Sequence, residues 1–185
     1  MAFRFESLEI PDVVLVRATR HGDARGWFAE TYKRSEFIQH GISEAFVQDN
    51  DSFSAARGTL RGLHFQRPPR AQAKLVRCLA GAIYDVAVDL RGDSATYGQW
   101  VAVELRPEAG TTLWIPAGFA HAFQTLEPDT RVAYKTTDEY DTACESGIRW
   151  DDPRLAISWP IERPILSSRD AALPLWQPSH PPFSR

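Results

Sequence analysis

The stretch KLVRCLAGAIYDVAVDL, residues 74–90, contains two apolar runs that meet at Gly81. Each run has the length and the share of β-branched and other apolar residues that are typical of a β-strand, and RGDS follows the second run as a turn signal. Four more such runs follow, separated by the turn sequences RPEAG and EPDT: QWVAVEL (99–105), TLWIPAG (112–118), HAFQTL (121–126) and RVAYKTT (131–137). Short strands at this spacing predict an all-β sandwich or barrel.

Outside these strands only one segment of the sequence looks helical. KRSEFIQHG, residues 33–41, predicts one short helix near the N-terminus, with Ser35 as its N-cap and Gly41 as its C-terminal stop. Seven of the thirteen prolines lie from Pro153 onward, so we expect an irregular C-terminal segment that ends in a loose tail over residues 177–185. Because the chain has no internal repeat and no low-complexity linker, we expect residues 1–185 to form a single domain.

The composition narrows the class of protein. Of the 185 residues, 43% are hydrophobic and 24% are charged, which is enough apolar material for one buried core. The net charge of −3 argues against a surface that binds nucleic acid or an anionic membrane through bulk positive charge. The chain has two cysteines, no apolar core of a signal peptide, and no apolar run of roughly 20 residues. These features predict a soluble protein of the reducing cytoplasm.

His64 lies in the sequence RGLHFQ, which begins at Arg61, and Lys74 follows ten residues later across a Pro-Pro turn. Buried imidazole and ammonium groups cost free energy unless other groups satisfy them, so both are either satisfied core residues or parts of a site. Period-2 alternation places His64 on the face opposite Leu63. Arg61 shares the face of Leu63, unless Gly62 permits a bulge that redirects it.

One histidine motif indicates a particular kind of barrel. In WIPAGFAHAFQT, residues 114–125, a Pro-x-Gly turn precedes His121, and this order resembles the second motif of the cupin barrels. The first cupin motif normally carries a His-x-His pair and a later Glu. Here Gln66 stands in the second position of the pair after His64, and no Glu lies between it and Gly81. Because zinc and iron sites need three or four placed ligands, we predict no catalytic metal.

Six motifs in a fixed order resemble the dTDP-4-dehydrorhamnose 3,5-epimerase family, and the resemblance runs from about Ile10 to Trp176. They are LRGLHFQ (60–66), AQAKLVRCLAGAIYDVAVDLR (71–91), SATYGQWVAVEL (94–105), LWIPAGFAHAF (113–123), YKTTDEY (134–140) and SSRD (167–170). The resemblance implies a cupin-type jelly-roll barrel. It also implies an enzyme that needs neither metal nor cofactor and that works in dTDP-rhamnose biosynthesis for cell-surface polysaccharide.

The implied substrate is dTDP-4-dehydro-6-deoxy-D-glucose, and the implied product is dTDP-4-dehydro-L-rhamnose, with C3 and C5 of the sugar inverted. Both carbons flank the C4 ketone. A base can therefore remove each proton to give an enolate, and an acid on the opposite face can return a proton with inversion.

The resemblance assigns catalytic roles to four residues and a supporting role to a fifth. His64 matches the general base, and Asp170 matches the carboxylate that orients its imidazole, although Asp170 also fits an N-cap of the following segment. Lys74 matches the cation beside the carbonyl oxygen, and His121 would be a second polar contact to that oxygen. Tyr134 matches the general acid, because a phenol with a pKa of about 10 keeps its proton at neutral pH.

The remaining matched positions are implied contacts to the nucleotide sugar. Tyr140 matches the residue that stacks on thymine, and Arg61 matches a diphosphate partner. Further implied contacts are Arg25, Glu30, Gln48, Asp49, Asn50, Glu145 and Arg169, the last standing where many members carry lysine. In the family the N-terminal segment is exchanged between subunits, so the resemblance also implies a homodimer in which Arg25 to Asn50 completes a neighbour's site.

Three other functions remain open from the sequence. A relative could epimerise only C3 or only C5 of a nucleotide 4-ketosugar in an antibiotic-sugar pathway, and the same base and acid would serve it. A ketoisomerase of similar barrel type would move the carbonyl between C3 and C4. A sugar-binding cupin without catalysis belongs to another class and would not need the proton-transfer residues His64 and Tyr134, both of which are present.

Overall fold

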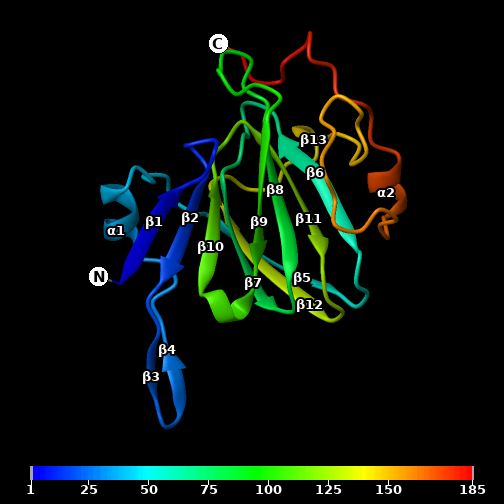
Figure 1. The fold of residues 1–185 in the computed structure, drawn as a ribbon. Coiled ribbons are helices and arrows are strands. Elements are labelled where there is room, and N and C mark those ends of the chain that lie inside the picture. The colour runs from blue at the N-terminus through cyan, green and yellow to red at the C-terminus, as the bar shows by residue number, and fades with distance from the viewer. Residues whose placement is uncertain (1, 185) are drawn as a thin grey trace.

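The computed structural model describes residues 2–184, which form two antiparallel sheets, a hairpin and two short α-helices (Figure 1). The first sheet has the order β1 (Phe3–Ser7), β2 (Val14–Ala18), β10 (Thr111–Ile115), β7 (Lys74–Ala80), β12 (Thr130–Thr136) and β5 (Gln48–Ser54). The second has the order β13 (Glu145–Gly147), β6 (Leu60–Gln66), β11 (Phe119–Thr125), β8 (Ile83–Asp89) and β9 (Trp100–Leu105). The prediction of an all-β barrel is confirmed.

Gly81 carries the chain from one sheet to the other. The two runs that meet there become β7 in the first sheet and β8 in the second. Gly81 has a φ of 71°, and a Cβ at this position would lie 2.3 Å from the Thr130 hydroxyl, so only glycine fits. Neighbours in sequence thus face each other across the barrel.

The hydrophobic core lies between the sheets. Val76 of β7 and Leu113 of β10 belong to one cluster with Ile83 of β8 and Leu105 of β9, and all four side chains are fully buried. Burying an aliphatic side chain of this size contributes about 1.5–3 kcal/mol. The alternating apolar positions therefore hold the two sheets together at one end and leave the polar residues of the other end around a hollow.

The C-terminal part of the chain covers the outer face of the second sheet. As predicted, it is irregular apart from α2 (Ser168–Ala171), and it packs Leu155, Trp159 and Trp176 against the strands. The end of the chain differs from the loose tail that the prolines suggested. Gly92 donates a backbone hydrogen bond to the Phe183 carbonyl at 2.7 Å, so the end lies against the barrel.

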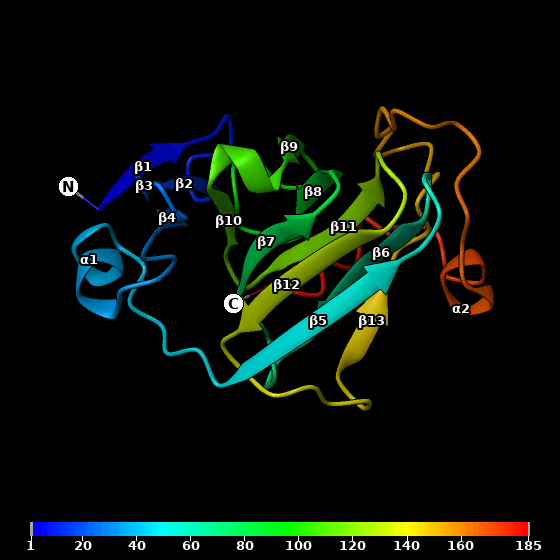
Figure 2. The same ribbon diagram turned by 90° about the horizontal axis from the view of Figure 1, so that it is seen from below.

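The two α-helices lie at opposite ends of the molecule (Figure 2). The predicted N-terminal helix is α1 (Arg34–Gln39), whose Phe37 packs edge-on against Phe3 and Phe5 of β1. Its N-cap is Lys33, which makes no side-chain cap, so the prediction of Ser35 as N-cap is wrong: Ser35 lies within the first turn. The predicted end is correct, because the Gly41 amide donates to the Ile38 carbonyl just after the helix.

Asp170, which the sequence allowed as the N-cap of the segment that follows it, lies within α2. Ser167 is the N-cap, and its hydroxyl accepts a hydrogen bond from the Asp170 backbone N–H at 3.0 Å. Asp170 therefore lies in the first turn, and the N-cap interpretation of Asp170 is wrong. Its carboxylate is free to point toward β6.

A bulge at Gly62 redirects Arg61. The register between β6 and β11 pairs His64 with His121 but Arg61 with Phe123, so it slips by one residue between them. Gly62 has a φ of 122°, and a Cβ there would lie 2.5 Å from the Ala122 Cβ. Because only glycine fits, Arg61 turns toward the hollow that His64 lines.

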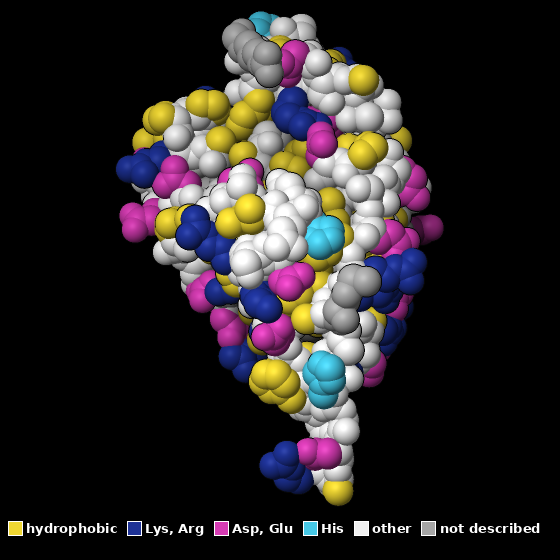
Figure 3. Space-filling view, turned by 90° about the vertical axis from the view of Figure 1, so that its left-hand side faces the viewer, with side chains coloured by type: hydrophobic (Ala, Val, Ile, Leu, Met, Phe, Trp, Pro, Cys, Tyr) yellow, Lys and Arg dark blue, Asp and Glu magenta, His cyan; other side chains and the backbone are white. Residues whose placement is uncertain are grey.

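The β3 (His21–Asp23) and β4 (Gly26–Phe28) hairpin extends away from the barrel (Figures 1 and 3). Trp27 and Phe28 on it are 60% and 68% exposed. Large apolar side chains on a projecting arm are typical of a surface that another molecule covers.

Candidate active site

One end of the barrel interior holds the polar residues that the sequence singled out. A hollow between the sheets is lined by residues of β5, β6, β7, β11, β12 and the segment around α2: Ser52, Arg61, His64, Lys74, His121, Phe123, Tyr134, Ser167, Arg169 and Asp170. A second hollow shares His64, Lys74 and Tyr134 with it and opens toward Tyr140 and Glu145. The two hollows form one candidate site.

His64 and Asp170 form a hydrogen-bonded pair in this site. The His64 Nε2 atom lies 2.7 Å from Asp170 Oδ1, and the Asp170 side chain is only 6% exposed while that of His64 is 32% exposed. Burial opposes ionisation of Asp170, but hydrogen bonds from His64, Ser167 and the Gly62 backbone hold its pKa below the usual value. A carboxylate fixed on Nε2 leaves Nδ1 as the nitrogen that can accept a proton.

Lys74 is a buried cation on the opposite sheet. Burial lowers the pKa of Lys74 to about 8, while the negative charges of Asp85 and Glu145 oppose that shift. Its Nζ lies 5.9 Å from the centroid of the Tyr134 ring. The turn between β6 and β7 therefore brings Lys74 and His64 to one hollow from two different sheets.

His121 and Asp85 form a second, fully enclosed pair. The His121 Nε2 atom lies 2.6 Å from Asp85 Oδ1, and the side chains are 6% and 0% exposed. Burial lowers the pKa of His121 more than the neighbouring Asp85 raises it, so the imidazole favours its neutral form. Among residues 2–184, no group bonds to the buried Oδ2 atom of Asp85.

Sequence reasoning missed Asp85. One signal was available: it is the first charged residue in the apolar run IYDVAVDL, where an unpaired carboxylate would be costly. The other acid of that run, Asp89, bonds to Arg91 and to the turn that follows.

Tyr134 of β12 lies across the hollow from β6. It pairs with Val76 of β7 and with Asn50 of the edge strand β5, so it lies one strand in from the edge of the first sheet. Burial raises the pKa of Tyr134, although the positive charge of Arg61 opposes this shift. The phenol therefore keeps its proton at neutral pH.

Tyr140, Glu145 and Arg169 form a hydrogen-bonded cluster at the rim. The Tyr140 hydroxyl donates to Glu145, and Arg169 forms an ion pair with the same carboxylate. Burial raises the pKa of Glu145, but these two partners lower it by more, so the carboxylate stays ionised. Arg169, which the resemblance matched to a lysine of many family members, thus holds the carboxylate of Glu145 at the rim.

Two of the three predicted β5 contacts line the hollow of their own chain, although the segment from Arg25 to Asn50 was expected to complete a neighbour's site. Gln48 and Asn50 line the hollow, and the Gln48 Nε2 donates to Asn50 Oδ1 at 2.8 Å. Asp49 does not belong with them in this chain, which corrects the prediction. Strand alternation turns its side chain to the outer face of the sheet, where it bonds to Lys135 at 2.8 Å.

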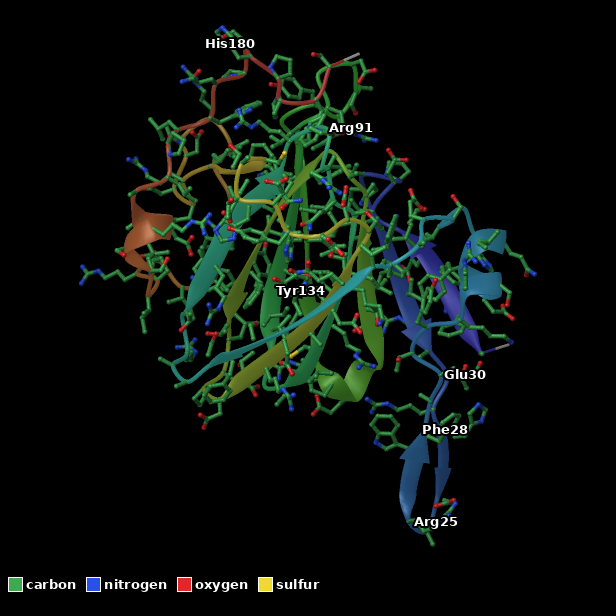
Figure 4. All side chains as sticks on the ribbon, turned by 180° about the vertical axis from the view of Figure 1, so that it is seen from behind. Arg25, Phe28, Glu30, Arg91, Tyr134 and His180 are labelled. Atoms are coloured by element: carbon green, nitrogen blue, oxygen red, sulfur yellow. The ribbon has the colours of Figure 1, made fainter. Side chains whose placement is uncertain are left out.

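Arg25 and Glu30 also lie away from the other site residues of the same chain (Figure 4). Arg25 is at the tip of the hairpin, with its side chain 90% exposed, and pairs with Asp23. The hairpin projects away from the hollow, so these two residues do not line the site of their own chain.

No metal site is visible in the part of the chain that the structure describes, since no three His, Cys, Asp or Glu side chains gather there in a way that could hold an ion. Gln66, at the position of the missing cupin ligand, bonds to backbone groups. No helix within residues 2–184 has the length and apolar character to span a bilayer.

The barrel and its hollow, with two histidine–carboxylate pairs, a buried lysine and a buried tyrosine, define a cupin-type enzyme of the sugar epimerase class. Residues 7–178 match the sequence model of the family described as dTDP-4-dehydrorhamnose 3,5-epimerase. The chain belongs to this family, and the resemblance found in its motifs is confirmed.

Similar proteins agree with this family over nearly the whole chain. A dTDP-4-dehydrorhamnose 3,5-epimerase of Sinorhizobium fredii is 49% identical over 92% of this chain and 88% of its own. The crystal structure of the Bacillus anthracis enzyme, with TDP and pyrophosphate bound, has a TM-score of 0.92 at 46% identity and covers 95% of this chain and 100% of its own. The Legionella pneumophila enzyme, in complex with dTDP-4-keto-L-rhamnose, has a TM-score of 0.89 at 43% identity and covers 94% and 92%. These likenesses confirm the cupin-type jelly roll.

Proposed function

We propose that the protein inverts C3 and C5 of dTDP-4-dehydro-6-deoxy-D-glucose and so forms dTDP-4-dehydro-L-rhamnose. The observation that carries this proposal is the placement of the His64–Asp170 pair on one sheet and of Lys74 and Tyr134 on the other, around one hollow. Epimerisation next to a ketone needs a base, a group that stabilises the enolate and an acid on the opposite face. The site offers all three in one chain.

His64 is the base in this proposal. Its Nδ1 removes the proton from C3 or C5 while Nε2 stays bonded to Asp170. The imidazolium that forms is stabilised by the Asp170 charge, which is already present because hydrogen bonds keep its pKa low.

Lys74 stabilises the enolate. A proton leaving C3 or C5 shifts negative charge onto the C4 oxygen, and a buried ammonium interacts with that charge more strongly than an exposed one would. His121 lies in the same hollow with its Nε2 bonded to Asp85 at 2.6 Å, so its Nδ1 can donate to the C4 oxygen only when the ring is protonated. Because both partners are fixed before reaction, little reorganisation is needed as the charge develops.

Tyr134 returns the proton on the face opposite His64. Its raised pKa keeps the phenol protonated until the enolate forms. After transfer, the phenolate takes a proton from solvent and the His64 imidazolium releases the proton that it removed, so the same cycle can run at the second carbon and complete the product.

The nucleotide part binds at the rim. Tyr140 is half exposed and offers one face of its ring to a base, beside the charged pair of Glu145 and Arg169. Arg61 at the bulge faces the hollow and supplies a guanidinium for the diphosphate. Gln48 and Asn50 line the same hollow and supply further polar contacts to the nucleotide sugar.

The protein acts as a homodimer in which the N-terminal segment of each chain completes the site of the other. The projecting hairpin supports this arrangement, because its Trp27 and Phe28 are exposed and its Arg25 has no access to the site of its own chain. Glu30 at its base would join Arg25 in the neighbour's site. We further propose that the enzyme works in the cytoplasm without metal or cofactor.

Proton NMR of the purified protein with the nucleotide sugar in deuterated water tests the function. The expected result is deuterium incorporation at both C3 and C5 with formation of the L-rhamno product. Exchange at one carbon only would indicate a mono-epimerase, and movement of the carbonyl would indicate a ketoisomerase. Binding with neither exchange nor conversion would leave a non-catalytic sugar-binding cupin.

A further inference from the structure

Gln66 uses its whole side-chain amide to hold two loops. Its Nε2 donates to the Arg70 carbonyl at 2.7 Å and to the Glu139 carbonyl at 3.1 Å, and its Oε1 accepts the Asp141 backbone N–H at 2.7 Å. The residue is 4% exposed, and no other type of side chain of this size both donates two hydrogen bonds and accepts one.

The loop that Gln66 holds carries Tyr140. Glu139 and Asp141 stand directly before and after this tyrosine, and the Tyr140 backbone N–H donates to Gln48 Oε1 at 2.9 Å. Two glutamine side chains therefore bind three consecutive residues of a loop that has no regular secondary structure. The ring of Tyr140 has little packing of its own, since the residue is 49% exposed, so its place depends on the backbone that carries it and on the hydroxyl bond to Glu145.

The same strand also carries the base. Gln66 stands two residues after His64, on the same face of β6, and pairs with Glu145 of β13 in the strand register. Glu145 in turn accepts the hydroxyl of Tyr140. One short strand therefore sets the distance between the proton-transfer end of the hollow and its aromatic rim.

We propose that Gln66 is a positioning residue that acts through Tyr140: it holds the ring where a flat aromatic group of the ligand stacks on it and thereby sets the affinity for the nucleotide. This inference rests on the proposed function, because it takes the nucleobase as the group that Tyr140 meets. Gln66 makes no contribution to proton transfer, since all its polar atoms bond to backbone.

Gln66→Met tests the proposal, because it keeps the length of the side chain and removes all three hydrogen bonds. Loss of base stacking is expected to raise the Kd for dTDP, and the KM for the nucleotide sugar, by about 5- to 100-fold. The kcat and the rate of deuterium exchange at saturating substrate should stay within about twofold of wild type. If Gln66→Met is not recovered folded, Gln66→Asn, whose amide is too short to reach both loops, carries the same expectation.

Gln124→Met is the matched control. Gln124 is also a buried glutamine whose amide bonds to backbone, with Nε2 on the Ile161 carbonyl at 2.8 Å and Oε1 on the Ile161 N–H at 3.0 Å, but it lies outside the site. Its replacement should lower the melting temperature without changing the Kd for dTDP. An equal loss of dTDP affinity in both variants would overturn the proposal, because the effect would then be one of general stability.

A double-mutant cycle shows whether Gln66 acts through Tyr140. In a Tyr140→Ala background, Gln66→Met should weaken dTDP binding little further, since the ring it positions is gone. The inference would be disproved if the losses of dTDP binding free energy from the two single substitutions added in full in the double variant. It would also be disproved if Gln66→Met bound dTDP with wild-type affinity.

Hydrogen exchange of the free protein separates this inference from the proposed function. The amides of Tyr140 and Asp141 should exchange faster in Gln66→Met than in wild type, whatever ligand the site takes. Unchanged exchange would overturn the positioning role by itself. A wild-type protein that does not bind dTDP would overturn the proposed function and the nucleotide role of Tyr140, while this exchange measurement would still decide whether Gln66 holds the loop.

Discussion

Asp170 Oδ1 lies 2.7 Å from His64 Nε2, although 106 positions separate the two residues in the chain. The contact forms because Ser167 caps α2 and places Asp170 in its first turn, next to β6. The strand that bears His64 and the helix that bears Asp170 come from distant parts of the sequence, so neither residue could be paired with the other from local patterns.

Replacing Asp170 by Asn should lower kcat by about 10²-fold or more without abolishing activity. The amide keeps the shape but removes the charge that stabilises the imidazolium of His64. His64→Ala, measured in parallel, should lose both epimerisation and deuterium exchange while dTDP still binds. NMR rates and dTDP titration check both variants; near-normal exchange in His64→Ala would mean that another residue is the base.

Tyr134→Phe should separate exchange from inversion. The variant keeps the base and the enolate stabiliser, so the enolate still forms, but the proton then returns mainly from His64 on the original face. Epimerisation should fall by about 10²- to 10⁴-fold, while deuterium incorporation falls much less. Both rates must be read in one deuterated sample, in which the proton on His64 has time to trade with solvent. A constant ratio of the two rates would assign the acid role elsewhere, first to Tyr140.

The activity should fall as the pH rises through about 8. Lys74 is cationic below its pKa of about 8 and neutral above it, and only the cation stabilises the enolate. Because the charge of Asp85 raises the pKa of Lys74, Asp85→Asn should move the alkaline limb of kcat/KM to lower pH. The pH profiles of the two proteins check this, and an unshifted alkaline limb in the variant would show that Lys74 does not set it.

Exhaustive chelation should leave the activity unchanged. The cupin position that would complete a histidine pair holds Gln66, whose amide is already bonded to backbone. The assay is epimerisation before and after prolonged dialysis against EDTA and phenanthroline. A loss that zinc, iron or manganese restores would contradict the proposal of metal-free catalysis.

Mixing two inactive variants should restore activity if the hairpin is exchanged. Arg25→Ala removes the contact offered by the arm, and His64→Ala removes the base of the barrel. In a mixed dimer the barrel of the first variant meets the intact arm of the second. Equal mixing after reversible dissociation should therefore recover about a quarter of the wild-type activity, because half of the dimers are mixed and each has one intact site. Absence of recovery together with a monomeric mass in light scattering would rule out the exchange.

Much of the barrel could be predicted because each of these strands leaves a recognisable pattern within a few consecutive residues. Apolar runs of strand length that are bounded by turn residues, such as those of residues 74–90, show their strands and the turn between them without knowledge of the rest. The prolines from Pro153 onward excluded further central strands for a similarly local reason, because proline has no backbone N–H to donate to a neighbouring strand. The resemblance of whole motifs then named His64, Lys74 and Tyr134, whose side chains the structure places around one hollow.

The sequence by itself thus determined the strands and turns between residues 74 and 137, because these depend on neighbours a few residues apart, and its motifs named the chemical groups of the site. Only the tertiary structure decided how those groups meet. It brought Arg61 to the hollow through the bulge at Gly62, turned Asp49 outward, and paired His121 with the buried carboxylate of Asp85. These outcomes depend on strand register and on contacts between sheets, where a shift of one residue reverses the face of a side chain.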